Sequence, residues 1–205
     1  MQTATLATTF FALTTLASAA LWMQDTKPTR FTHPMPKDMK EGMERWKATM
    51  KPGPAHERLK ELLGTYDISI KNPMAGSGEL KSTGTFSWLT EGKWLKFEWS
   101  GATMFGRNGS GLWLLGYDNF KERYVGMQVD SMQTCMNTMS GHFDMSGDNL
   151  ILWGTIDEPA TPEQDKYVRY IFRGFGQDAF TFEIHDMMIG ESDTKVIEMA
   201  FTRKK

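Results

Sequence analysis

After Gly64 the apolar residues of this chain recur at every second position, and this twofold period continues to the C-terminus. Residues 111–130 show it most clearly: an aromatic and aliphatic run enters a polar turn at 118–122 and leaves as a strict alternation. This period is typical of β-strands, because successive side chains of a strand point to opposite faces of the sheet. The segment therefore predicts an antiparallel hairpin, and similar units follow it along the chain.

Helical spacing occurs before Gly64, in residues 37–63. One face of the first stretch is apolar and the other is charged, and the apolar positions are Met39, Met43, Trp46 and Met50. Pro54 is placed to begin a second helix over 55–63, and Gly64 ends it. We expect two short helices that pack on the sheet or plug it.

The remaining chain predicts an all-β fold of about ten short strands joined mostly by tight turns. An up-and-down antiparallel barrel is favoured over an open sandwich, because closure removes exposed strand edges. A single alternation places one set of side chains in the interior: Tyr66, Ile68, Phe86, Trp88, Leu95, Phe97, Trp99, Val125, Met127, Val129, Val168, Tyr170, Phe172, Phe180, Phe182, Ile184, Ile197, Met199 and Phe201.

The N-terminus has the pattern of a secretory signal. Residues 1–20 carry no charge, and an apolar run is followed by Ala17-Ser18-Ala19. We expect a signal peptide at 1–19, a proline-containing linker at 20–36, a helical extension at 37–63 and a β-barrel domain at 64–205. The protein would then be exported, periplasmic or secreted, with no stable membrane span. Because no basic residue precedes the apolar run, an uncleaved N-terminal anchor is the alternative.

Composition limits the partners. The chain has 23 basic and 25 acidic residues, with no basic block beyond Arg203-Lys204-Lys205, so a nucleic-acid partner is not expected. Aromatic residues at 12% and 16 methionines indicate a large core or a lined cavity. The single cysteine, Cys135, excludes an intramolecular disulfide and is expected to be buried. No pattern in the sequence fixes an oligomeric state.

Several short motifs occur in a recognisable order: Pro52-Gly53-Pro54-x-His56, Leu62 to Asp67, Gly111 to Asn119, Val129 to Met132, and Met199 to Lys204. In this order they resemble the domain-of-unknown-function family 1579, bacterial proteins with a calycin-like (lipocalin-related) β-barrel. The resemblance runs from about Lys37 to the C-terminus. It implies a fold and no biochemical activity.

The resemblance also implies structural roles. Tyr66 stands where the family usually has Trp, and in lipocalin-like barrels a basic residue of the last strand packs across that ring. By similarity Arg203 would pack on Tyr66 and close one end of the barrel. Gly116, Tyr117 and Asp118 form the family's hairpin turn and are interpreted as turn-fixing residues.

Catalytic and metal chemistry receive little support. The four histidines lack metal-ligand spacing, and the methionines around Cys135 are better interpreted as core residues than as copper ligands, so no metal or cofactor is expected. An enzyme would need inward-facing carboxylates, with His185 or Arg169 beside them. The candidates are Glu98, Asp130, Glu183 and Glu198, which we expect on the outer face instead, apart from Asp130.

The favoured hypothesis is a non-enzymatic barrel that binds a small apolar or amphipathic molecule in its interior. The candidate ligand-binding residues are Trp88, Phe97, Trp99, Met127, Asp130, Tyr170, Phe182 and Met199. Asp130 either caps its turn through Ser131 and Thr134 or orients a polar ligand group at the barrel mouth. The alternatives are an enzyme with inward carboxylates and a structural or interaction module with a filled core.

Overall fold

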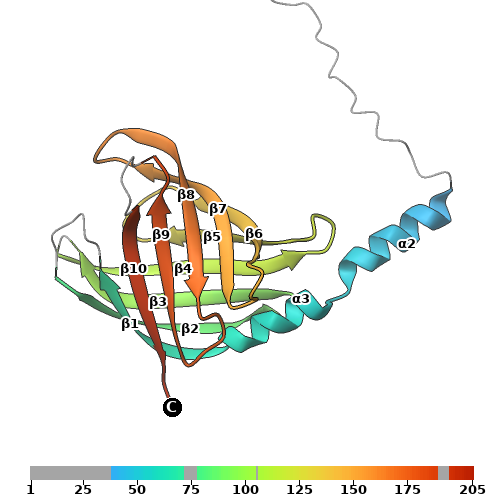
Figure 1. Ribbon diagram of the computed structural model, residues 1–205, viewed down its shortest axis with the longest axis horizontal. Coiled ribbons are helices and arrows are strands. Elements are labelled where there is room, and N and C mark those ends of the chain that lie inside the picture. Colours follow the sequence, from blue (N-terminus) through green and yellow to red (C-terminus); the bar gives the residue numbers. More distant parts are fainter. Residues whose placement is uncertain (1–37, 72–77, 105, 189–193) are drawn as a thin grey trace, which may run out of the picture. The chain divides into compact units, whose positions relative to one another are not determined.

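The computed structural model describes residues 38–71, 78–104, 106–188 and 194–205 (Figure 1). The expected signal peptide and linker, residues 1–36, lie outside the described residues. The chain divides into two units after Gly42, and the second unit, Met43–Lys205, is compact and contains the barrel. No helix among the described residues is both long enough and apolar enough to cross a membrane.

Ten described strands form a closed antiparallel barrel, as the sequence predicts, and the open sandwich is excluded. Each strand pairs with its neighbours in the chain, and β1 closes the barrel by pairing with β10. The strands are β1 (Gly64–Lys71), β2 (Leu80–Thr90), β3 (Trp94–Met104), β4 (Arg107–Asp118), β5 (Arg123–Asp130), β6 (Asn137–Phe143), β7 (Asn149–Glu158), β8 (Glu163–Arg173), β9 (Ala179–Asp186) and β10 (Lys195–Arg203).

Helical segments precede the barrel. The first is α2 (Met39–Met50), and the second consists of a short α-helix, α3 (Pro54–Glu57), continued by a 3-10 helix, η1 (Arg58–Leu62). The expected single helix over 55–63 is therefore only partly α-helical. It ends in an i to i+3 hydrogen bond, from the Leu63 N–H to the Lys60 carbonyl, which tightens the last turn before β1.

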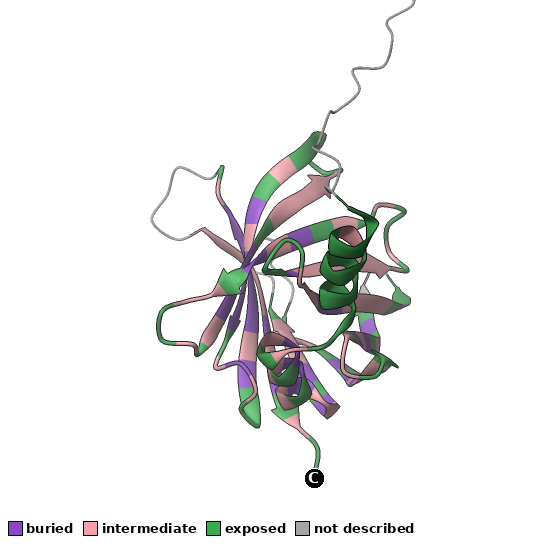
Figure 2. Ribbon diagram, turned by 90° about the vertical axis from the view of Figure 1, so that its right-hand side faces the viewer, coloured by how far each residue is buried: buried purple, intermediate pink, exposed green. Residues whose placement is uncertain are grey.

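The α3–η1 segment plugs one end of the barrel, which we call the plug end. Leu59 and Leu62 are completely buried there. Two strand tyrosines hold the segment: the Tyr66 hydroxyl donates to the Leu62 carbonyl at 3.0 Å, and the Tyr124 hydroxyl donates to the Ala55 carbonyl at 2.9 Å. Figure 2 shows the buried positions alternating along the strands. The plug end is thus closed by apolar packing and by hydrogen bonds to main-chain carbonyls.

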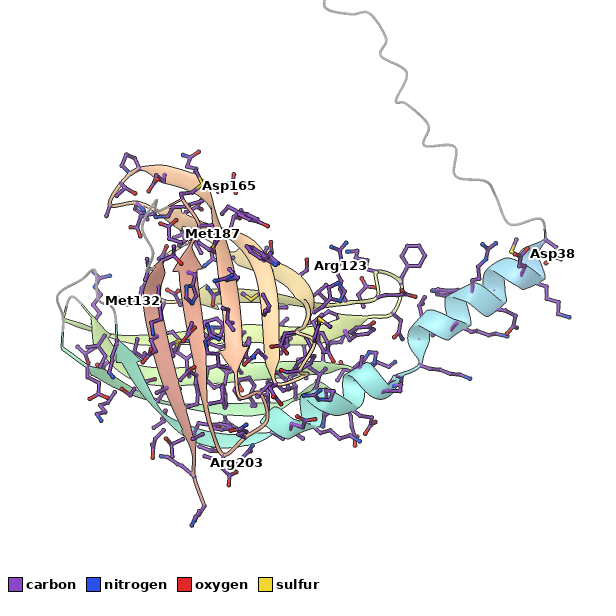
Figure 3. The ribbon with its side chains drawn as sticks, in the orientation of Figure 1. Asp38, Arg123, Met132, Asp165, Met187 and Arg203 are labelled. Carbon is purple, nitrogen blue, oxygen red and sulfur yellow. The ribbon has the colours of Figure 1, made fainter. Side chains whose placement is uncertain are left out.

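We call the opposite end the mouth. It is formed where β1 meets β2, β3 meets β4, β5 meets β6, β7 meets β8 and β9 meets β10. Figure 3 marks Met132, between β5 and β6, and Met187, directly after β9. Because the plug covers the other end, the mouth is the end at which the interior can meet solvent.

Aromatic rings fill the middle of the barrel. Phe86 stacks on Phe97 with ring centroids 4.2 Å apart, and Phe180 stacks on Phe201 at 4.5 Å. Trp113 packs on Phe182 at 4.6 Å. The space left among these rings is about 10 Å³, which can hold at most one water molecule. The mid-barrel is therefore a packed core and not a ligand cavity.

One strand departs from the predicted alternation. Tyr124 is buried and Gly126 packs against Leu115 and Met139, so the inward face of β5 continues through Gln128 to Asp130. The prediction that Val125, Met127 and Val129 face the interior is wrong, because these residues share the opposite, outer face. The pairing of Tyr117 with Tyr124 across the hairpin sets this register. As a result the apolar face of β5 points outward and its polar face points inward.

Candidate functional site

The polar face of β5 gives the barrel interior a group of amides and a carboxylate near the mouth. Gln128 lies opposite Asn137 of β6 on one side and Trp113 of β4 on the other. Asp130 lies opposite Gly111. Gln128, Asp130, Asn137 and Trp113 all keep partial exposure, whereas inward side chains such as Tyr66 and Phe180 near the plug are buried. This wall of the mouth is thus polar, inward-facing and accessible to solvent.

Asp130 caps its own turn, through partners other than those expected. Its Oδ1 accepts hydrogen bonds from the backbone N–H groups of Met132 at 2.8 Å and Gln133 at 3.1 Å. Ser131 instead pairs with β4, where its hydroxyl accepts from the Ser110 N–H at 3.0 Å. The predicted capping through Ser131 and Thr134 is therefore wrong in its partners. In the described parts of the chain, Oδ2 of Asp130 accepts no hydrogen bond, so this oxygen can receive one from a ligand.

Trp99 supplies a donor on the neighbouring wall. Its indole lies against Gly111, where a Cβ would come within 2.4 Å of Nε1, so this position must be glycine. The indole Nε1 is buried and has no hydrogen-bond partner among the described residues. An unpaired buried N–H costs about 1–3 kcal/mol. The site therefore holds one unsatisfied donor close to the polar face of β5.

The polar side chains described on the opposite wall of the mouth pair with other groups of the protein. Asp186 pairs with Lys166 at 3.0 Å, and both side chains are nearly buried. Burial lowers the pKa of Lys166, but hydrogen bonds to Asp186 and Glu163 outweigh it and raise the pKa above its usual value. The Tyr170 hydroxyl donates to the Thr155 carbonyl at 3.3 Å, and burial raises its pKa. Among the described residues of this wall, Lys166, Asp186 and the Tyr170 hydroxyl therefore pair with groups of the protein itself.

The other predicted ligand-binding residues lie outside the mouth. Phe97, Phe182 and Met199 belong to the packed core, and Trp88 is a half-buried inward residue towards the plug end. Met127 lies on the outward-facing side of β5. Of the predicted set, Trp99 and Asp130 are brought to the mouth, whereas Tyr170 is completely buried in the core beside Phe182. Sequence reasoning missed Gln128, Asn137 and the Lys166–Asp186 pair; for Gln128 the signal was its alternation with Asp130.

The predicted structural residues lie at the plug end. The Arg203 guanidinium lies 4.8 Å from the Tyr66 ring centroid and donates to the carbonyls of Leu63 and Glu61. Tyr117 packs edge-on against His56 and Tyr124, with ring centroids 5.6 Å and 5.0 Å away.

The β4–β5 turn is fixed by local contacts. Asp118 accepts hydrogen bonds from the N–H groups of Phe120 at 2.9 Å and Lys121 at 3.0 Å, and these bonds lower its pKa. Gly116 lies under the Trp94 ring, where a Cβ would approach within 2.5 Å. Asp118 therefore fixes the turn, whereas Gly116 makes room for the Trp94 ring of the neighbouring strand β3.

Of the carboxylates considered for catalysis, Asp130 faces inward at the mouth, whereas Glu98, Glu183 and Glu198 lie on the outer face. Glu98 alternates with the buried Phe97, and Glu183 and His185 alternate with Phe182 and Ile184. The hypothetical inward acid–base group is therefore absent among the described strands.

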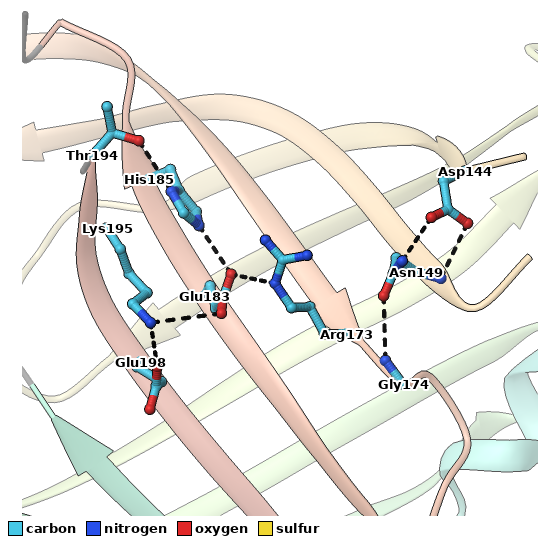
Figure 4. Close-up of polar contacts among 9 residues, drawn as sticks. All are labelled: Asp144, Asn149, Arg173, Gly174, Glu183, His185, Thr194, Lys195 and Glu198. Carbon is cyan, nitrogen blue, oxygen red and sulfur yellow. Dashed lines mark hydrogen bonds and ion pairs between the residues drawn. The ribbon is translucent and has the colours of Figure 1, made fainter. Parts of the chain in front are cut away.

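On that outer face Glu183 forms an ionic cluster (Figure 4). It accepts from Arg173 Nε at 2.7 Å and contacts His185 Nε2 at 3.0 Å, and Thr194 Oγ1 lies 3.0 Å from His185 Nδ1. Burial raises the pKa of Glu183, but its hydrogen bonds to His185 and Arg173 outweigh burial and lower it. Within the described chain no three His, Cys, Asp or Glu side chains gather as metal ligands.

Comparison with known proteins extends the resemblance noted from the motifs. The family model described as "Protein of unknown function (DUF1579)" matches residues 51–203. The chain belongs to this family. The match begins after α2 and covers the plug and all ten strands of the barrel.

One solved structure agrees on the fold. The crystal structure of Rv2717c from M. tuberculosis is 17% identical, with a TM-score of 0.56, and the match covers 76% of this chain and 100% of that one. A redesigned β-barrel is 14% identical, with a TM-score of 0.39, over 72% of this chain and 96% of the other. No curated protein matches the chain. The likeness to Rv2717c supports a calycin-like barrel and nothing about activity.

Proposed function

We propose that this protein binds a small amphipathic molecule at the mouth of its barrel. The observation that carries the proposal is the buried, unpaired Nε1–H of Trp99, which lies beside the inward polar face of β5. A ligand that accepts from this N–H would remove an unsatisfied buried donor. Gln128 and Asn137 can each donate and accept, and Oδ2 of Asp130 can accept.

The ligand is small because the barrel below the mouth is full. Ligand cavities usually measure about 300–1,000 Å³, whereas the mid-barrel leaves about 10 Å³ among Phe97, Trp113 and their neighbours. The apolar part of the ligand therefore rests on the exposed surfaces of Trp99 and Trp113. Its polar part meets the amides of Gln128 and Asn137.

The proposed role is non-enzymatic, because the polar groups of the mouth are suited to holding a ligand. Gln128 and Asn137 have no acid–base chemistry, and Asp130 is occupied in capping its turn through Oδ1. The uncharged N-terminal segment with its Ala17-Ser18-Ala19 signal supports export, so the ligand would be met in the periplasm or outside the cell.

Binding can be tested with the neutral fluorescent ketone prodan, whose carbonyl oxygen can accept from Trp99. Trp99→Phe keeps an aromatic ring and removes the N–H, and Gln128→Leu removes the amide. We expect each to weaken prodan binding about fivefold, the value of one hydrogen bond of about 1 kcal/mol. Trp94→Phe, an outward tryptophan on the same strand, is the matched control and should leave binding unchanged.

Native mass spectrometry of protein purified from its own cell envelope complements the titration. An adduct that is lost in Trp99→Phe and kept in Trp94→Phe supports the site. If prodan binds the Trp99 and Trp94 variants equally, or does not bind at all, and no adduct is found, the mouth is not a ligand site.

A further inference from the structure

Two apolar surfaces of the described residues reach solvent, one exposed and one partly exposed. The first is the stripe of α2, made of Met39, Met43, Trp46 and Met50, whose side chains are 40% to 81% exposed. The second, which we call the outer stripe, consists of Leu112, Leu114, Val125, Met127 and Val129 on the outer faces of β4 and β5. We propose that α2 of one copy of this chain packs on the outer stripe of a second copy, reciprocally, to form a dimer.

The helix requires a partner. A helix of 12 residues is marginal in water when it is isolated, and Gly42 weakens this one further. None of the residues of α2 is buried. Most helical stability in proteins comes from packing an apolar face. The Met/Trp stripe of α2 is such a face, and no described residue covers it.

The outer stripe matches the helix in apolar character and in length. Its register pairs are Leu112 with Val129 and Leu114 with Met127, so its apolar side chains stand side by side. Towards the mouth, Leu112 and Val129 line an open groove of about 520 Å³ together with Glu98, Ser110 and Ser131. Apolar side chains with polar residues beside them suit an amphipathic helix. The stripe spans about 13 Å from Val125 to Val129, within the helix length of about 18 Å.

The helix cannot easily cover the stripe of its own chain. Asn119, in the β4–β5 turn, donates through Nδ2 to the carbonyls of Lys51 at 2.8 Å and Thr49 at 3.3 Å. Residues Met43–Met50 belong to the same compact unit as the barrel and are exposed throughout. To reach the stripe of its own barrel, α2 would have to break this attachment. A second copy can approach while the attachment stays intact.

Reciprocal exchange also provides enough contact area. If the four helix side chains bury about 400 Å², and the stripe a similar area, one contact removes about 800 Å² from solvent. Two symmetric contacts then reach about 1,600 Å², the size of a typical stable interface. The area buried by one helix on one stripe would be smaller than that of a typical stable interface.

The mass of the purified protein in solution tests the dimer. Sedimentation velocity should give twice the chain mass, and Trp46→Lys and Leu112→Lys should each raise the dimer dissociation constant at least tenfold. Leu89→Lys, an exposed apolar residue on the outer face of β2, is the matched control and should remain dimeric. A wild-type monomer at all concentrations, or a Trp46→Lys variant that dimerises normally, would overturn the proposal.

Disulfide trapping distinguishes exchange from docking within one chain. In a Cys135→Ser background, Trp46→Cys and Val129→Cys are made in separate proteins and mixed under oxidising conditions. Exchange predicts a disulfide between the two different proteins, because each helix meets the stripe of the other copy. If the mixture stays uncrosslinked, while a chain that carries both cysteines closes an internal disulfide at monomer mass, the exchange is refuted.

Discussion

Arg203 joins the last strand to the plug, and its replacement should weaken the whole barrel. Its guanidinium donates to the carbonyls of Leu63 and Glu61 and lies over the Tyr66 ring. Each charge-assisted hydrogen bond contributes about 1–1.5 kcal/mol at this partly exposed position, and the cation–π contact about 0.5–1 kcal/mol. Its pairing with the exposed Asp178 adds little. Arg203→Met should therefore cost about 3 kcal/mol.

Thermal unfolding followed by circular dichroism measures this loss. For a chain of this size, about 3 kcal/mol corresponds to a fall in Tm of about 6–12 °C. Arg203→Lys keeps the charge, but a lysine cannot bind both carbonyls at once as arginine does. The fall in Tm should therefore be about half that of Arg203→Met. Lys204→Met removes the exposed ion pair with Asp67 and should change Tm by less than about 2 °C. Equal effects of Arg203→Met and Lys204→Met would refute the role given to Arg203.

Two further predictions concern the barrel wall. A Cβ at Gly84 would lie 2.4 Å from the Phe97 ring, so Gly84→Val should cost about 2–3 kcal/mol in urea unfolding, and Gly78→Ala, in open space, should cost almost nothing. The pKa of Glu183 is lowered in the folded state, so Glu183 stabilises the barrel above its unfolded pKa, and this contribution is lost as the pH falls through the folded value. Arg173→Met removes one lowering contact and should move the acid-unfolding midpoint to higher pH; an unchanged midpoint would contradict this.

The sequence predicts the barrel well because the twofold period is strong on six of the described strands: β1, β2, β3, β8, β9 and β10. Tyr66, Phe97, Phe182 and Phe201 alternate with polar residues, and apolar burial forces each of these strands into one register. The strand β5 fails this rule. Its most apolar face, Val125 to Val129, points outward, because cross-strand pairing with Tyr117 and Leu115 fixes Tyr124 and Gly126 inside.

The candidate site could be predicted only in part for the same reason. Asp130 was recognisable at a strand end, and Trp99 by its alternation with Glu98. Gln128 and Asn137 could not be recognised from the sequence. A polar residue on a strand with few apolar neighbours is assigned to the solvent face unless the strand register is known. The nearly buried Lys166–Asp186 pair joins β8 to β9, and no local sequence pattern predicts a contact between residues so far apart in the chain.

The plug is made early in synthesis, but it is held by strands that are made later. Residues 54–62 are made before any strand, yet the groups that hold them come from β1, β5 and β10, with Arg203 only two residues from the C-terminus. The same last strand closes the barrel on β1. A growing chain therefore cannot seal its core until β10 has been made, and loss of β10 would open the wall and release the plug together.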